Sequence, residues 1–153
     1  MGLINSCKKD EPTYSLAPKN PNQQKLLDLV NKARSKGCNC GDEYYPPVDS
    51  VKWNAKLEQA AQKHSNDMND NNFFSHTGSD GSEHHERILS TGYDCGWTGE
   101  NIANGYTTEE AVVNGWLKSE GHCKNIMNEH YTEMGVATAG SYWTQDFAAP
   151  KNN

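Results

Sequence analysis

The first regular pattern of apolar residues in the chain predicts a helix that begins at residue 21. Asn20 and Pro21 supply an N-cap and a proline at the first helical position. Gly37 follows the last periodic residue and marks the end of the helix. The apolar side chains between these residues recur at helical spacing and form one inward face, which contains Leu26, Leu27, Val30 and Ala33.

A second, longer helix is predicted after Asn54, which is a good N-cap and precedes another apolar stripe. A short helix is expected within residues 82–91, around Arg87, Ile88 and Leu89. A firmer one should follow the capping box Thr107-Thr108-Glu109-Glu110 and run to Trp116. The stripe on the second helix consists of Leu57, Ala60, Ala61, His64 and Met68.

The C-terminal part of the chain changes from helical to strand patterning. Residues 134–138 and 142–147 are short runs of the strand type, joined by a turn centred on Gly140. Helices followed by a closing hairpin predict an α+β domain with an antiparallel sheet. A length of 153 residues fits one such domain, which we place at residues 21–150 behind a polar tether of residues 1–20.

Composition and charge exclude two classes of function. The formal net charge is −6 and no stripe of lysine or arginine appears, which makes nucleic acid an unsuitable partner. No apolar run approaches the length of a membrane span. We therefore expect a monomeric domain that contacts a membrane only through a lipid anchor.

The N-terminal sequence Leu3-Ile4-Asn5-Ser6-Cys7 suggests where that anchor would be attached. It resembles the end of a bacterial lipoprotein signal, with Cys7 as the lipidated residue. The same segment also satisfies an N-myristoylation pattern through Gly2 and Ser6. Four further cysteines favour export, because paired cysteines suit an oxidising compartment. We expect the protein outside the cell or on the cell surface.

Three residues in separate ordered motifs are the main candidates for chemistry. His76 follows Phe74-Ser75, Glu100 precedes Asn101-Ile102, and His122 stands between Gly121 and Cys123. Two neutral imidazoles and a carboxylate form a ligand set that Zn²⁺ or a similar divalent cation accepts. The same groups also suit general acid and base chemistry. Glu100 would serve as a ligand or as the carboxylate that orients a histidine, in preference to a base.

These motifs together resemble the CAP superfamily of cysteine-rich secretory, antigen 5 and pathogenesis-related 1 proteins, in its bacterial form. The resemblance extends from about residue 24 to residue 147. It implies a three-layer α-β-α sandwich with a central cleft lined by two histidines and two acids. The matching stretches are residues 60–65, 74–76, 99–103, 116, 121–127, 134–136 and 142–145.

By this resemblance, His76, Glu100 and His122 occupy the cleft. The family's second acid lies on the helix that carries Trp116, and the nearest acid in this chain is Glu120. The segment between Trp116 and His122 is shorter than in eukaryotic members, which weakens any transfer of their sterol binding. The ligand is left open as a small molecule, a lipid or a component of the cell envelope.

Cysteine placement and the family resemblance together lead us to expect two disulfides, Cys40–Cys123 and Cys38–Cys95. Cys38 and Cys40 are too close in sequence to bridge each other comfortably, so each needs a distant partner. Cys7 is the cysteine left over.

Two other functions are alternatives to a binding domain with a metal-capable cleft. A hydrolase or protease would use Ser75 beside His76, but no Gly-x-Ser-x-Gly elbow is present. A structural or adhesion domain would need no working cleft. Among the other histidines, we expect His64 in the core and His84, His85 and His130 in solvent-facing loops.

Overall fold

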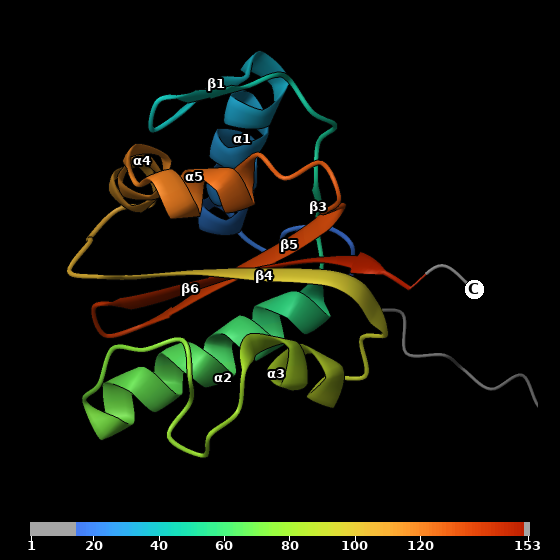
Figure 1. Cartoon of the computed structure of the whole chain (residues 1–153). Helices are drawn as coiled ribbons and strands as arrows, with labels where there is room; N and C mark the ends of the chain where they lie inside the picture. The colour runs from blue at the N-terminus through green and yellow to red at the C-terminus, as the bar shows by residue number, and fades with distance from the viewer. Residues whose placement is uncertain (1–14, 152–153) are drawn as a thin grey trace, which may run out of the picture.

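A computed structural model describes residues 15–151 and shows three layers (Figure 1). Helices α1, α4 and α5 cover one face of a sheet, and α2 and α3 cover the other. This confirms the predicted α+β class and three-layer sandwich. Cys7 lies outside the described residues. The helices are α1 (Pro21–Lys36), α2 (Ala55–Asn71), α3 (His84–Ser90), α4 (Glu109–Lys118) and α5 (Glu120–Ile126).

The central sheet has the strand order β3-β5-β6-β4. Its β5–β6 and β4–β6 pairs are antiparallel, whereas β3 runs parallel to β5. We expected an antiparallel sheet, and the β3–β5 pair departs from that expectation. A separate hairpin joins β1 and β2. The strands are β1 (Cys38–Cys40), β2 (Glu43–Tyr45), β3 (Lys52–Trp53), β4 (Cys95–Asn104), β5 (Glu133–Ala139) and β6 (Tyr142–Pro150).

The local signals for α1 and α2 act as predicted, whereas α4 is capped by Thr108, one residue later than the Thr107 of the predicted capping box. Asn20 caps α1 by accepting a hydrogen bond from the Gln23 N–H, and Asn54 and Thr108 cap α2 and α4 in the same manner. Gly140 adopts a positive φ of 57° in the turn between β5 and β6, a conformation that glycine enters without steric cost. These elements form the frame that carries the candidate residues.

Two apolar clusters lie on opposite sides of the sheet. The larger packs α1, α4 and α5 and contains the buried Trp53, Trp116 and Trp143. The smaller packs α2 and α3 around Leu57 and Ile88. Burial of these side chains is the main term that holds the layers together.

The sheet also explains why one expected disulfide is absent. Cys40 and Cys123 are bonded, with Cα atoms 5.4 Å apart, as we expected. Cys38 and Cys95 are both free, so the expected Cys38–Cys95 bridge is wrong. Cys38 packs against the larger apolar cluster and Cys95 against the smaller one, so the two thiols cannot meet.

Arg34 ties the first helix to later parts of the chain. Its side chain is fully buried and donates hydrogen bonds to four backbone carbonyls. The guanidinium presents five N–H donors in a planar fork, which suits this multiple contact. The acceptors are the carbonyl oxygens of Asp49, Ile126, Asn128 and Tyr131.

Candidate functional site

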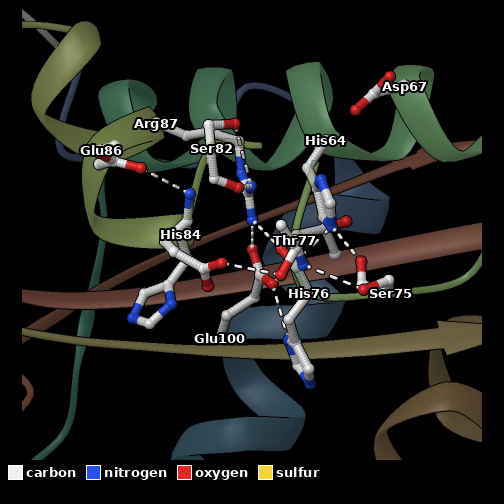
Figure 2. Close-up of polar contacts among 12 residues, drawn as sticks. His64, Asp67, Ser75, His76, Thr77, Ser82, His84, Glu86, Arg87 and Glu100 are labelled. Carbon is white, nitrogen blue, oxygen red and sulfur yellow. Dashed lines mark hydrogen bonds and ion pairs between the residues drawn. The ribbon is translucent and has the colours of Figure 1, made fainter. Parts of the chain in front are cut away.

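The candidate site centres on Glu100, which projects from β4 beneath α2 and α3 (Figure 2). Its Oε1 lies 2.9 Å from His76 Nδ1, and its Oε2 lies 2.8 Å from an Arg87 guanidinium nitrogen. The side chain is only 1% exposed. Burial works to raise the pKa of Glu100, but the hydrogen bond from His76 and the charge of Arg87 outweigh it and lower the pKa. Glu100 is therefore a buried carboxylate.

Arg87 fixes both the carboxylate and the segment that carries His76. Arg87 Nη2, the nitrogen that binds Glu100, also donates to the backbone oxygen of His76 at 2.9 Å. Arg87 Nη1 donates to the backbone oxygen of Ser82 at 2.6 Å. Arg87 comes from α3 and is itself buried. A buried arginine with these acceptors holds the loop between α2 and α3 against β4.

His76 is oriented by this arrangement. Its Nδ1 must donate to Glu100, because a carboxylate only accepts, and this places the lone pair of the neutral ring on Nε2. The His76 side chain is 51% exposed. The hydrogen bond to Glu100 raises the pKa of His76 above its ordinary value. The site thus presents a basic imidazole at the surface, and the buried Glu100 carboxylate sets its tautomer.

His122 lies on α5, on the opposite side of the sheet from α2 and α3. It is the third residue of that helix and directly follows Gly121. Its backbone oxygen accepts a hydrogen bond from the Asn101 side chain at 3.1 Å. Burial lowers the pKa of His122, and the nearby charge of His76 lowers it further. Adjacent residues of β4 therefore serve two partners: Glu100 holds His76, and Asn101 holds the helix of His122.

Comparison with known proteins identifies the family of the chain. The model of the cysteine-rich secretory protein family matches residues 27–147, which is most of the chain. The chain belongs to this family. The match begins within α1 and ends in β6, so it spans all three layers of the sandwich.

Bacterial relatives support the assignment to the cysteine-rich secretory protein family. The chain is 35% identical to the uncharacterized membrane protein YlbC and to the uncharacterized protein YkwD, both of Bacillus subtilis. Each match covers 82% of this chain but only 34% and 46% of the relatives. An extracellular Bacillus anthracis protein containing an SCP domain is 32% identical. Its structure matches with a TM-score of 0.73, covering 86% of this chain and 44% of that one. The chain thus spans less than half of each of these proteins.

Glu120 does not take the place of the family's second cleft acid in the structure. Its carboxylate lies 2.7 Å from Lys124 Nζ, one helical turn away on α5. The side chain is exposed and borders Gly41 in the turn between β1 and β2. Glu120 belongs to this outer surface, and the match of sequence position alone placed it in the cleft.

A buried acid that the sequence analysis missed is Asp146 on β6. It stands directly opposite Glu100 in the β4–β6 register and is fully buried. Burial raises the pKa of Asp146 well above its ordinary value, and the neighbouring Glu100 charge adds to this. A neutral Asp146 beside a charged Glu100 is the state that these surroundings favour.

His64 behaves as the core histidine that we expected. It is fully buried, and its Nε2 donates to the Ser75 backbone oxygen at 2.8 Å. Its Nδ1 has no partner, and burial lowers the pKa of His64. The ring projects from α2 and contacts the loop that carries His76 through this Ser75 oxygen (Figure 2).

The other three histidines, His84, His85 and His130, lie outside the pair formed by His76 and Glu100. His84 is not a plain loop residue, because it begins α3 and its Nε2 lies 3.1 Å from the Thr98 hydroxyl. His85 also lies in α3 and not in a loop, but it is exposed, as expected. His130 is also exposed, and its ring stacks on Trp97 with centroids 4.1 Å apart. An exposed stacked pair of this kind shields ring surface from water.

The donor set fits a metal ion only in part. Both oxygens of Glu100 are already engaged, so Glu100 suits the role of orienter better than that of ligand. Within residues 15–151, one group of three potential ligands lies within 4.8 Å of one another, and it is made of cysteines. His76 and His122 are the two remaining candidates among the expected ligands, and neither belongs to that cysteine group.

Two cavities lie elsewhere on the protein. A cavity of about 440 Å³ borders α5 and the β2 end, and one of about 300 Å³ borders α1 and α2; neither is lined by His76 or His122. The first cavity is lined by Tyr45, Pro46, Val48, Lys124, Asn125, Met127, Asn128, Glu129 and His130.

The opposite shifts of the two site histidines give a first testable prediction. In metal-free protein, NMR titration should give a pKa above 6.5 for His76 and below 6.5 for His122. Glu100→Gln should lower the pKa of His76, because an amide does not stabilise the imidazolium as a carboxylate does. His85→Ala is the control and should change neither value. A His76 pKa that is unchanged in Glu100→Gln would show that Glu100 does not set it.

Proposed function

We propose that the chain is an extracellular or surface-tethered binding domain in which His76 and His122 bind Zn²⁺ or a similar divalent cation. The observation that carries this proposal is the contact between Glu100 and His76 Nδ1. A histidine whose second nitrogen donates to a carboxylate is the usual form of a histidine metal ligand. Nε2 of His76 then offers its lone pair outward.

The electrostatics of His122 support the same role. Its lowered pKa keeps the ring neutral, and only a neutral imidazole has a lone pair for a cation. A bound cation would supply a Lewis-acidic centre to which an anionic group of a ligand attaches. The ligand class remains a small molecule, a lipid or a cell-envelope component.

The location outside the cell rests on two observations. A disulfide between Cys40 and Cys123 suits an oxidising compartment. The similar Bacillus anthracis protein is described as extracellular. No helix within the described part of the chain is long and apolar enough to cross a membrane. Lipidation of Cys7 would provide the tether, and it lies outside the described residues.

A hydrolase is less well supported than a binding domain. His76 and Glu100 resemble the base and orienter of a catalytic triad, but a triad also needs a nucleophile aimed at the base. The Ser75 hydroxyl accepts a hydrogen bond from the Thr77 N–H in a local turn. Ser75 is thus a part of the loop that positions His76.

Calorimetry with chelator-treated protein at neutral pH is the direct test of cation binding. His76→Ala and His122→Ala should each abolish the zinc heat, because each removes one of two protein ligands. Glu100→Gln should weaken binding about 10- to 100-fold, the usual effect of losing an orienting group. His85→Ala should bind as the unchanged protein does, and His64→Ala should keep affinity but lose stability.

The pH dependence sharpens this test. Protons compete with the cation for Nε2 of His76, and Glu100 raises the pKa of that ring. When the pH is lowered, binding should therefore begin to weaken while the pH is still above 6.5. A histidine with an unperturbed pKa would begin to lose the cation only at a lower pH. Absence of zinc heat, or unchanged binding in the double His76→Ala/His122→Ala variant, would leave these histidines with a structural role.

A further inference from the structure

Three sulfur atoms meet where the β1–β2 hairpin covers α5. Cys38 and Cys40 are two residues apart on β1, so their side chains point to the same face of the strand. Cys40 is bonded to Cys123 of α5, and the Cys38 sulfur lies 3.6 Å from the Cys123 sulfur. All three sulfurs lie within 4.8 Å of one another. A free thiol is thus in contact with a disulfide.

Exposure differs sharply among the three cysteines. Cys40 and Cys123 are both 0% exposed, whereas Cys38 is partly exposed. A thiol from solution cannot reach the buried bridge without opening the fold, because exchange requires direct contact between the attacking sulfur and a disulfide sulfur. Cys38 is the member of the group that faces both the bridge and the solvent.

We propose that Cys38, Cys40 and Cys123 form a thiol–disulfide exchange site, with Cys38 as its entry point. In the internal step, the Cys38 thiolate attacks the Cys123 sulfur. The Cys38–Cys123 bond forms, the Cys40–Cys123 bond breaks, and Cys40 leaves as the thiolate. Cys40 then takes up the proton that Cys38 gave up, so the step is an isomerisation without net oxidation.

The exchanged bridge is open to thiols of other molecules. Once Cys38 is part of the disulfide, an external thiolate attacks its partly exposed sulfur. A mixed disulfide forms on Cys38, and the electron pair of the broken bond remains on the Cys123 sulfur. The partner is therefore a small thiol or an accessible cysteine of another protein.

The surroundings of Cys38 limit how fast the exchange runs. Burial raises the pKa of the Cys38 thiol, so the attacking thiolate is a minor form at neutral pH. The buried Cys40–Cys123 bridge is then the resting state, and exchange is slow rather than absent. Both bridges keep Cys123 tied to β1, so the helix that carries His122 stays anchored during the internal step.

Reduction kinetics under native conditions test the proposal. Glutathione is the probe, and the bridge is followed by alkylation, digestion and mass mapping of the full chain. Cys38→Ser should slow reduction of Cys40–Cys123 by at least about tenfold, because the direct route needs the fold to open. Cys95→Ser removes another partly exposed free thiol, and it should leave the rate unchanged. In denaturant, all three proteins should be reduced at the same rate.

A second variant tests the geometry without kinetics. Cys40→Ser should form the Cys38–Cys123 bridge on mild oxidation, because the two sulfurs are already in contact. Equal native reduction rates in the unchanged protein and Cys38→Ser would overturn the proposal, as would a folded Cys40→Ser protein in which Cys38 and Cys123 stay free. If Cys40→Ser does not fold, the Cys38→Ser rates decide alone. Neither outcome depends on zinc binding.

Discussion

Replacing Arg87 with methionine should lower the free energy of unfolding by about 3–5 kcal/mol, the cost of leaving a buried charge without its partner. Glu100 would keep its buried position but lose the guanidinium 2.8 Å away. The backbone oxygen of His76 would also lose the Arg87 donor, and that of Ser82 would keep only the Gly78 N–H. Urea denaturation at neutral pH measures the change.

Two comparisons separate the charge effect from loss of packing. The double variant Arg87→Met/Glu100→Gln should recover part of the lost stability, because the stranded charge is removed. Lys124→Met breaks an exposed ion pair with Glu120 and should change stability little. If Arg87→Met alone proved as stable as the unchanged protein, the Glu100–Arg87 contact would not be the structural centre of the site.

Replacing Cys123 with alanine should lower stability by about 4 kcal/mol, because it removes a cross-link that restrains the unfolded chain. The bridge joins residues 83 positions apart, and long loops gain most in the chain-entropy model. Cys123→Ala also removes the partner of Cys38, so no exchanged bridge can replace the lost one. Thermal and urea unfolding of oxidised protein measure the loss.

Matched variants identify the source of that effect. Reduction of the unchanged protein should produce a similar loss without altering packing, and Cys95→Ala should have a much smaller effect. Cys40→Ala should lose less than Cys123→Ala, because Cys38 can take over the bridge. A Cys123→Ala protein as stable as the oxidised parent would contradict the cross-link account.

The parts of the fold that the sequence predicted are those with local causes. Caps at Asn20, Asn54 and Thr108 are short-range hydrogen bonds, so the starts of α1, α2 and α4 could be identified from neighbouring residues. The β5–β6 hairpin is likewise local. By contrast, α5 is a short helix that starts at Glu120 directly after α4, with no side-chain hydrogen bond capping it. It was therefore missed.

The sequence predicted only those residues of the candidate site that stand in recognisable motifs. His76, Glu100 and His122 stand in distinctive motifs, but Arg87 and Asp146 reach Glu100 through the fold, from α3 and β6. One signal was available: the chain has only two arginines, Arg34 and Arg87, and both are buried. Arginine in a chain that otherwise uses lysine indicates a position that needs a planar fork of donors.

The disulfide partners could not be derived from spacing for a similar reason. The side chains of Cys38 and Cys40 lie on the same side of β1. This follows from the strand conformation of these residues, which the sequence did not reveal. Cys95 appeared to be a suitable second partner only because the sheet that separates it from Cys38 was not visible.

The contacts of Arg34 determine when the first layer of the fold can form. Three of its acceptors lie 92 to 97 residues later in the chain, so α1 cannot complete its contacts before the chain has been synthesised as far as Tyr131. Contacts between distant parts of a chain also slow folding. A shorter nascent chain therefore lacks the native packing of α1, and an unpacked chain is what passage through a membrane as an extended polypeptide requires.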